Sequence, residues 1–212
     1  FWSLTRYEDI MAVNKNHKDW SSDHSNGGHV LGYENWFNDD SGLYWPMFLA
    51  MDEPKHSTQR KAVSPVVSTN NLKKIEAMIR ANVQEILDSL PENEPFDWVE
   101  QVSVELTTRT IATLFDFPME DRKLLTRWSD YAFAIPGDGL IQNWDQRTSV
   151  MMEMKEVFED LRDERRKTNG YDLISIIANP INGNELSSEE YMGNVILLLV
   201  GGNDTTRNSM TA

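Results

Sequence analysis

The stretch VILLLVGGNDTTRNSM, residues 195–210, joins a run of six apolar residues directly to two glycines and an aspartate. Such a run is typical of a buried helix, but each glycine inside a helix costs about 1 kcal/mol relative to alanine. An aspartate beside an apolar run is also costly to bury without partners. Either the helix ends with a cap at Gly202-Asn203, or it continues because something has to fit beside the glycines. The spacing alone leaves both interpretations open.

A continuous helix would give this stretch an unusual face. Residues three and four positions apart lie on the same side of a helix. The side in question carries Leu197, Gly201, Asp204, Thr205 and Asn208. It passes from apolar side chains to bare backbone and then to an acid and a hydroxyl, an order that core packing does not require. Bare backbone would let a bulky planar group come close, and the acid and hydroxyl beyond it could relay protons.

Capping and periodicity predict more helices before this stretch. Ser187 with Glu190 forms a capping box that would open the helix just described, and Asp97 with Glu100 forms a second one. Apolar residues with helical spacing predict helices over 71–90, from 97 to 114, from 118 to 128, from beyond the 134–139 break to about 170, and over 172–178. Near the start, FWSLTRYEDIMAV fits a strand followed by a short helix. The sequence therefore predicts a mainly α fold with a small β portion.

Composition and charge exclude several classes of function. The 212 residues carry a net charge of −14, from 34 acidic and 20 basic side chains, which argues against a nucleic-acid partner. The chain has no cysteine, so it has neither disulfides nor a thiolate ligand, and its longest apolar run is six residues, too short to span a bilayer. It starts without methionine or a signal-peptide pattern and ends within a helical pattern. We expect a piece, residues 1–212, of a longer cytoplasmic protein.

A second stretch, FLAMDEPKHSTQRKAVSPVVS at residues 48–68, has a recognisable spacing. Pro54 suits the first turn of a helix. His56 and Arg60 then lie four residues apart on one face, where they could donate hydrogen bonds to a single anionic group such as a carboxylate. Taken alone, such a pair usually marks a solvated surface.

Together the two stretches resemble the cytochrome P450 family of haem-thiolate monooxygenases. Residues 201–206, GGNDTT, match the family's I-helix motif without a departure, and HSTQR at 56–60 matches its C-helix pattern. Glu53 stands where a second proline is common. Both stretches look most similar to the bacterial soluble alkane-hydroxylating subfamily. The resemblance covers essentially the whole chain and implies the N-terminal-to-central part of the P450 fold, ending within the I-helix.

The resemblance also implies roles for individual residues. His56 and Arg60 would hydrogen-bond a propionate of haem b, and Gly201 and Gly202 would let the haem and dioxygen approach the helix backbone. Asp204 and Thr205 would deliver protons to dioxygen, so that one oxygen atom can be inserted into an unactivated C–H bond. The axial cysteine and the family's Glu-x-x-Arg element are expected downstream. The chain itself would therefore supply no metal ligand, and we expect it to be inactive alone.

An apolar pocket and external electron donors complete this interpretation. Leu197, Leu198 and Phe133 are candidate pocket residues, and further candidates are Trp36, Phe37, Tyr44, Trp45, Phe48, Ile135 and Pro136. Such a lining suits a medium-chain alkane or fatty acid that is hydroxylated at its terminus. No nucleotide-binding motif is present, so electrons would come from a ferredoxin and an NAD(P)H-dependent ferredoxin reductase. Residues 53–80 hold six basic side chains against two acidic ones, a candidate docking face for the ferredoxin.

Two other functions fit parts of the sequence. His17, His24 and His29 with Asp23 could be taken as a non-haem iron site, but their spacing matches no recognisable ligand geometry. A non-enzymatic helical binding module with an apolar cavity would explain the amphipathic helices equally well. It does not explain the Gly-Gly pair within an apolar helix or the spacing of His56 and Arg60.

Overall fold

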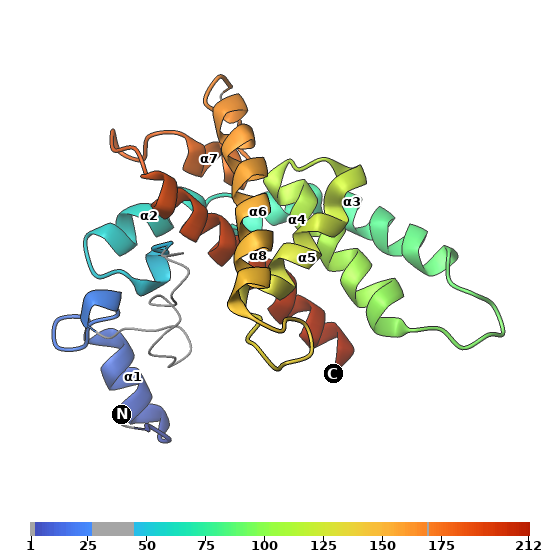
Figure 1. The fold of residues 1–212 in the computed structure, drawn as a ribbon, viewed down its shortest axis with the longest axis horizontal. Helices are drawn as coiled ribbons and strands as arrows, with labels where there is room; N and C mark the ends of the chain where they lie inside the picture. The colour runs from blue at the N-terminus through green and yellow to red at the C-terminus, as the bar shows by residue number, and fades with distance from the viewer. Residues whose placement is uncertain (1–2, 27–44, 169) are drawn as a thin grey trace.

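The computed structural model describes residues 3–26, 45–168 and 170–212. In these ranges the chain is mainly helical, as predicted (Figure 1). The α-helices are α1 (Tyr7–Lys15), α2 (Lys55–Val63), α3 (Thr69–Asp88), α4 (Glu105–Phe115), α5 (Arg122–Ala132), α6 (Trp144–Arg165), α7 (Leu173–Ala178) and α8 (Ser188–Thr211). Short 3-10 helices lie at His24–Asn26, Phe48–Ala50 and Met119–Asp121, and a π-helical stretch at Val99–Val104 leads into α4.

The β structure is smaller than the sequence suggested near the start of the chain. In the described residues it consists of two isolated bridges, Pro136 with Ile141 and Ile181 with Asn184. Of the segment expected to hold a strand and a short helix, residues 7–15 form the helix α1. Phe1 and Trp2 lie outside the described residues.

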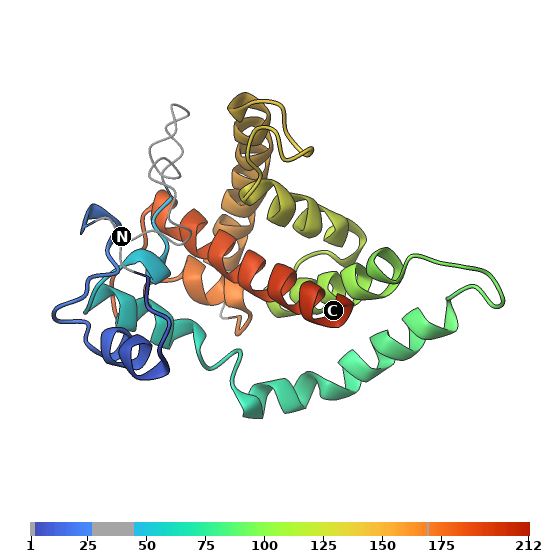
Figure 2. The ribbon, with the colours of Figure 1, turned by 90° about the horizontal axis from the view of Figure 1, so that it is seen from below.

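The helix α8 runs without interruption through Gly201 and Gly202. Its start is fixed by the predicted capping box, because the Ser187 hydroxyl accepts from the Glu190 N–H and the Glu190 carboxylate accepts from the Ser187 N–H. With 24 residues it crosses the middle of the molecule in both ribbon views (Figures 1 and 2). The interpretation in which the helix ends at the glycines is therefore wrong.

Aromatic side chains form the centre of the core beside α8. Trp128 of α5 and Phe158 of α6 have ring centroids 5.6 Å apart, and both rings also contact Phe117. Phe115 at the end of α4 meets Phe158 edge-on at 6.1 Å. Tyr191 of α8 is fully buried, and its hydroxyl donates to the carbonyl of Phe158. These contacts pack α4, α5, α6 and α8 together into one core.

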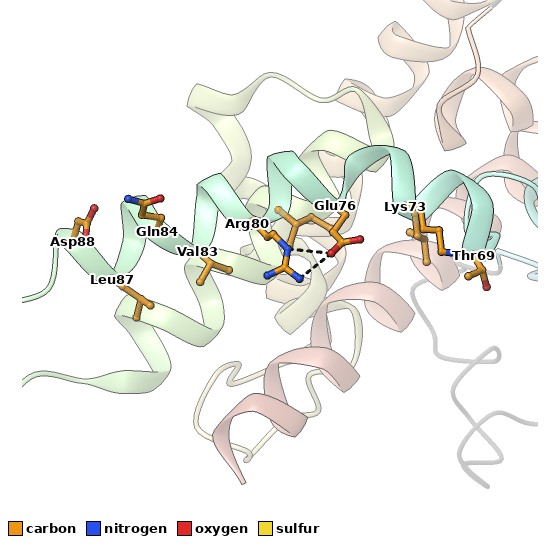
Figure 3. Close-up of a pocket in the computed structure, with 10 residues that line it drawn as sticks. Thr69, Lys73, Glu76, Arg80, Val83, Gln84, Leu87 and Asp88 are labelled. Atoms are coloured by element: carbon orange, nitrogen blue, oxygen red, sulfur yellow. Dashed lines mark hydrogen bonds and ion pairs between the residues drawn. The ribbon is translucent and has the colours of Figure 1, made fainter.

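The helix α3 extends away from this core (Figures 1 and 2). The sequence predicted an apolar face on this helix, but only Ile86 on it is buried. Leu72, Ile79, Val83 and Leu87 instead line an open groove of about 710 Å³, in which Arg80 and Glu76 form an ion pair of 2.8 Å (Figure 3). Periodicity therefore located the apolar face correctly, but within the described residues nothing packs on most of it.

No helix in the described ranges combines the length and the apolar character that crossing a membrane requires.

Candidate functional site

One face of α8 opens onto an apolar cavity of about 640 Å³. Four of the five residues predicted to share that face, namely Leu197, Gly201, Asp204 and Thr205, line it, whereas Asn208 does not. Phe133 contributes from the end of α5. The other lining residues, which the sequence did not single out, are Met47, Leu49, Ser129, Asp130, Ala134, Asp138, Leu140, Val200 and Arg207. Apolar walls with a few polar groups at one place are typical of small-molecule sites.

The two glycines of the motif have different surroundings. A Cβ atom added to Gly201 would meet no atom within 4 Å, so its backbone faces open space at the cavity. A Cβ atom added to Gly202 would lie 2.2 Å from Cδ1 of Ile111, a buried residue of α4. Gly201 thus leaves room at the cavity, whereas Gly202 lets α8 pack closely against α4.

Asp204 belongs to a chain of charges that joins α8 to α5. One guanidinium nitrogen of Arg207, Nη2, lies 2.7 Å from Asp204 Oδ1 and 2.9 Å from Asp130 Oδ1. Burial alone lowers the pKa of Arg207, but hydrogen bonds and charges from Asp130 and Asp204 outweigh it and raise that pKa. Arg207 therefore stays charged and ties the Asp204 carboxylate to the wall of the cavity.

Thr205 and Asp138 add two further polar groups to the cavity. The Thr205 hydroxyl donates to the carbonyl of Gly201 at 2.7 Å, one turn earlier in the same helix. Asp138 accepts from the N–H groups of Ile135 and Leu140, at 2.9 and 2.8 Å, and these bonds lower the pKa of its carboxyl. The loop after α5 therefore presents an ionised carboxylate at the mouth of the cavity.

The predicted anion-binding pair lies on α2 and does not line this cavity. The Arg60 side chain is exposed, and its guanidinium makes no hydrogen bond or ion pair within the described part of the chain. His56 is partly buried, and its Nδ1 lies 3.4 Å from Oε1 of Glu53. The pKa of the Glu53 carboxyl is lowered mainly by a hydrogen bond from the Ser57 hydroxyl and, to a smaller extent, by the contact with His56. Arg60 is thus free to bind an anion.

Other predicted residues have different positions. Leu198 packs against the hydrophobic core and does not line the cavity. Trp45 is buried in that core, while Trp36, Phe37, Tyr44 and His29 lie outside the described residues. Over the described ranges, no three histidine, aspartate or glutamate side chains come together as metal ligands would.

Arg207 and Asp130 are the most informative residues that the sequence did not reveal. Arg207 lies three residues after Asp204, so helical spacing alone could have suggested their ion pair. Asp130 lies 77 positions before its partner Arg207, and no local sequence pattern connects it to α8. Its role follows only from the packing of α5 against α8.

Several known proteins are similar to this chain in sequence and fold. No protein-family model matches the chain. Its sequence is 30% identical over 215 residues to linalool 8-monooxygenase of Pseudomonas putida, a match that covers 100% of this chain and 53% of that protein. Cytochrome P450-153 from Novosphingobium aromaticivorans superposes with a TM-score of 0.81 at 38% identity, over 99% of this chain and 52% of that one. The chain is similar to cytochrome P450 proteins both in sequence and in fold.

A second solved P450 gives nearly the same agreement. CYP153D17 from Sphingomonas sp. PAMC 26605 has a TM-score of 0.80 and 39% identity, over 100% of this chain and 52% of that one. The chain therefore spans about half the length of the relatives it matches. Its α2 and α8 carry the two stretches by which the sequence resembles the family.

Proposed function

We propose that the whole protein is a haem-dependent monooxygenase that inserts one atom of dioxygen into an unactivated C–H bond. The observation that carries the proposal is the uninterrupted course of α8 through Gly201 and Gly202. This course turns Leu197, Gly201, Asp204 and Thr205 toward one apolar cavity. An apolar wall, bare backbone and proton-carrying groups on one face are what such a reaction requires of the protein.

The residues of this chain fit a haem. Open space beside Gly201 would accept a flat group against the backbone of α8. Arg60, whose guanidinium is unpaired in the described residues, and His56, four residues earlier, would hold a propionate. When bound, the haem would supply the activation of dioxygen. Residues 1–212 contain no cysteine, so they would not provide a thiolate ligand for its iron.

The protein's part in the chemistry would be proton delivery and exclusion of water. The Asp204 carboxylate would carry protons from the solvent side, and the Thr205 hydroxyl would pass them into the cavity. Arg207 would act as a positioning residue, because its ion pairs at 2.7 and 2.9 Å hold Asp204 between α8 and α5. The apolar side chains of Leu197 and Phe133 would keep bulk water away from the reacting atoms.

The apolar lining favours a hydrocarbon substrate. The side chains of Leu49, Phe133 and Leu197 offer no hydrogen-bond donor or acceptor, and Met47 offers only a weakly accepting sulfur. They would therefore hold an alkyl chain mainly by burial. Similarity to the alkane-hydroxylating subfamily supports hydroxylation at the chain terminus. We infer a medium-chain alkane or fatty acid as the substrate.

Incubation of the whole protein with octane, dioxygen and a reducing system tests this proposal. We expect 1-octanol as the main product, identified by gas chromatography with mass detection. Products hydroxylated only at inner carbons, or no product from a haem-loaded protein, would rule out terminal hydroxylation. An Asp204→Asn variant serves as the matched control, because it keeps the shape of the side chain and removes the carboxylate.

Electrons would come from a ferredoxin that is reduced by an NAD(P)H-dependent reductase. Six basic side chains on or beside α2 and α3 are all exposed, namely Lys55, Arg60, Lys61, Lys73, Lys74 and Arg80. On a protein whose net charge is −14, this surface would attract a small acidic partner. If Lys73→Glu combined with Lys74→Glu leaves ferredoxin affinity and its salt dependence unchanged, the docking face lies elsewhere.

A further inference from the structure

A buried amide on α8 links three separate parts of the chain. Asn194 is 0% exposed, and its side chain bonds in two directions. Its Oδ1 accepts from the backbone N–H of Phe48 at 3.0 Å, and its Nδ2 donates to Oε1 of Gln59 at 2.7 Å. Gln59 is itself only 6% exposed. We call Asn194, Gln59 and the Phe48 N–H the Asn194 junction.

The direction of these bonds is fixed by chemistry. A backbone N–H can only donate, so Oδ1 of Asn194 must face Phe48 and Nδ2 must face Gln59. Gln59 then has to present its carbonyl oxygen to α8. Because both amides are buried, a lost bond leaves a polar group without compensation from water.

The Phe48 side of the junction forms part of the cavity wall. Met47 and Leu49, the neighbours of Phe48, line the cavity beside Gly201. The same segment lies against the backbone of α8, because a Cβ atom added to Gly193 would be 2.1 Å from the carbonyl oxygen of Pro46. Two neighbouring residues therefore hold residues 46–48 against α8. Gly193 allows the close approach of Pro46, and Asn194 accepts the hydrogen bond from Phe48.

The Gln59 side of the junction sets the rotation of α2 about its own axis. Lys55 and Gln59 lie four residues apart on one face of α2, and they meet Glu190 and Asn194, which are likewise four apart on α8. The exposed Lys55–Glu190 contact, at 3.9 Å, is weak, so the buried Gln59–Asn194 bond carries the register. His56 and Arg60 each follow one of these residues. The bond to Asn194 therefore holds the face of α2 that carries these two residues in a fixed orientation relative to α8.

We propose that Asn194 is a positioning residue that couples the cavity wall at Met47 and Leu49 to the orientation of His56 and Arg60. The coupling toward haem rests on the proposed function, whereas the mechanical link between α8, α2 and residues 46–49 does not. A displacement of the cavity wall would then be passed to the anion-binding pair through the buried side chain of Asn194.

Hydrogen exchange with residue-level resolution tests the mechanical link in the whole protein. Asn194→Leu should increase exchange at the Phe48 amide and along residues 55–63 by about tenfold, which corresponds to about 1.4 kcal/mol. Gln59→Met, which keeps the packing, should increase exchange along α2 and leave the Phe48 amide unchanged. Thr108→Val is the matched control, because it removes another bond between helices, the partly buried 2.6 Å contact with Thr126, without touching α2.

The outcomes separate the inference from the proposed function. Exchange that rises equally in all helices, or not at all, in both variants would overturn the junction. A second measurement titrates hemin into the apoprotein, where Asn194→Leu should weaken binding about tenfold and Thr108→Val should leave it unchanged. Unchanged hemin affinity in Asn194→Leu would overturn the positioning role. Failure of the unmodified protein to bind hemin would contradict the proposed function and the role toward haem, and exchange would then decide the link by itself.

Discussion

Gly201 and Gly202 are adjacent in the sequence, but only one of them faces the cavity. A methyl group would fit at Gly201, whereas at Gly202 it would collide with Ile111 of α4. A glycine within a helix can therefore be kept for a ligand or for packing, and the residue type does not distinguish the two. The distinction depends on which neighbouring helix each position faces.

Alanine substitutions should separate these two roles. Gly201→Ala should raise the free energy of unfolding by about 1 kcal/mol, because alanine favours the helix and nothing obstructs its methyl group. Gly202→Ala gains the same helix preference, but its methyl group displaces the end of the buried Ile111 side chain at a cost of about 1–3 kcal/mol. The net effect should be a free energy of unfolding that is unchanged or lower by up to about 2 kcal/mol. Urea unfolding of both variants measures the difference. Equal effects of the two substitutions would contradict the assignment.

Glu105 provides a prediction on pH dependence. Burial alone raises the pKa of its carboxyl, but hydrogen bonds from Arg122 at 2.7 Å and Arg109 at 2.8 Å outweigh it and lower that pKa. The unfolded chain, in which the pKa of a glutamate is about 4.3, therefore binds a proton more readily than the folded chain. The stabilisation is complete above that value and is lost as the pH falls through the pKa of the folded state.

A Glu105→Gln variant tests this sign. At pH 7 it should lower the free energy of unfolding by roughly 1–3 kcal/mol, because two charge-assisted hydrogen bonds are weakened. As the pH falls below about 5, the difference in free energy of unfolding from the unmodified chain should shrink, since both chains then carry a neutral side chain at position 105. Urea unfolding across this range measures it. A difference that grows as the pH falls would show that the sign is wrong.

At the scale of the elements, α3 differs most from the other long helices. Its apolar face has the right periodicity for burial, yet Ile86 is 2% exposed and the adjacent Leu87 is 46% exposed. Ile86 faces the body of the protein, while Leu87 faces the groove along the helix (Figure 3). Two neighbouring aliphatic residues thus have opposite surroundings.

Truncating each of these residues should therefore have very different effects in the 212-residue chain. Ile86→Ala should lower the free energy of unfolding by about 2–5 kcal/mol, because it removes buried methylene groups from a packed site. Leu87→Ala should change it by about 0.5 kcal/mol or less. Chemical unfolding of the pair gives both values. A comparable loss for Leu87→Ala would mean that the groove is covered in solution.

Local signals predicted the helices well because the helix ends are built from local bonds. The Ser187–Glu190 box forms as expected, and Asp172 accepts from the Ser175 N–H at the start of α7. The face of α8 also followed from spacing, since Leu197, Gly201, Asp204 and Thr205 line one cavity. Spacing cannot reveal which other element, if any, packs against a given helix face. This is why the exposed face of α3 was not foreseen.

The unpredicted part of the site comes from contacts between distant segments. Asp130 reaches Arg207 only because α5 packs across α8, and Phe48 reaches Asn194 across 146 positions. Both contacts depend on tertiary packing and leave no trace in local sequence patterns. The resemblance to the P450 family supplied the order of the two motif-bearing helices, but not the buried bonds that hold them together.

At the scale of the whole molecule, the central claim is that the face of α8 beside Gly201 belongs to a haem site. The most direct measurement is a carbon-monoxide difference spectrum of the whole protein after reduction. The account predicts haem uptake and the red-shifted Soret band typical of thiolate-ligated haem. A whole protein that is folded but takes up no haem would contradict it, and the open backbone at Gly201 would then need another explanation.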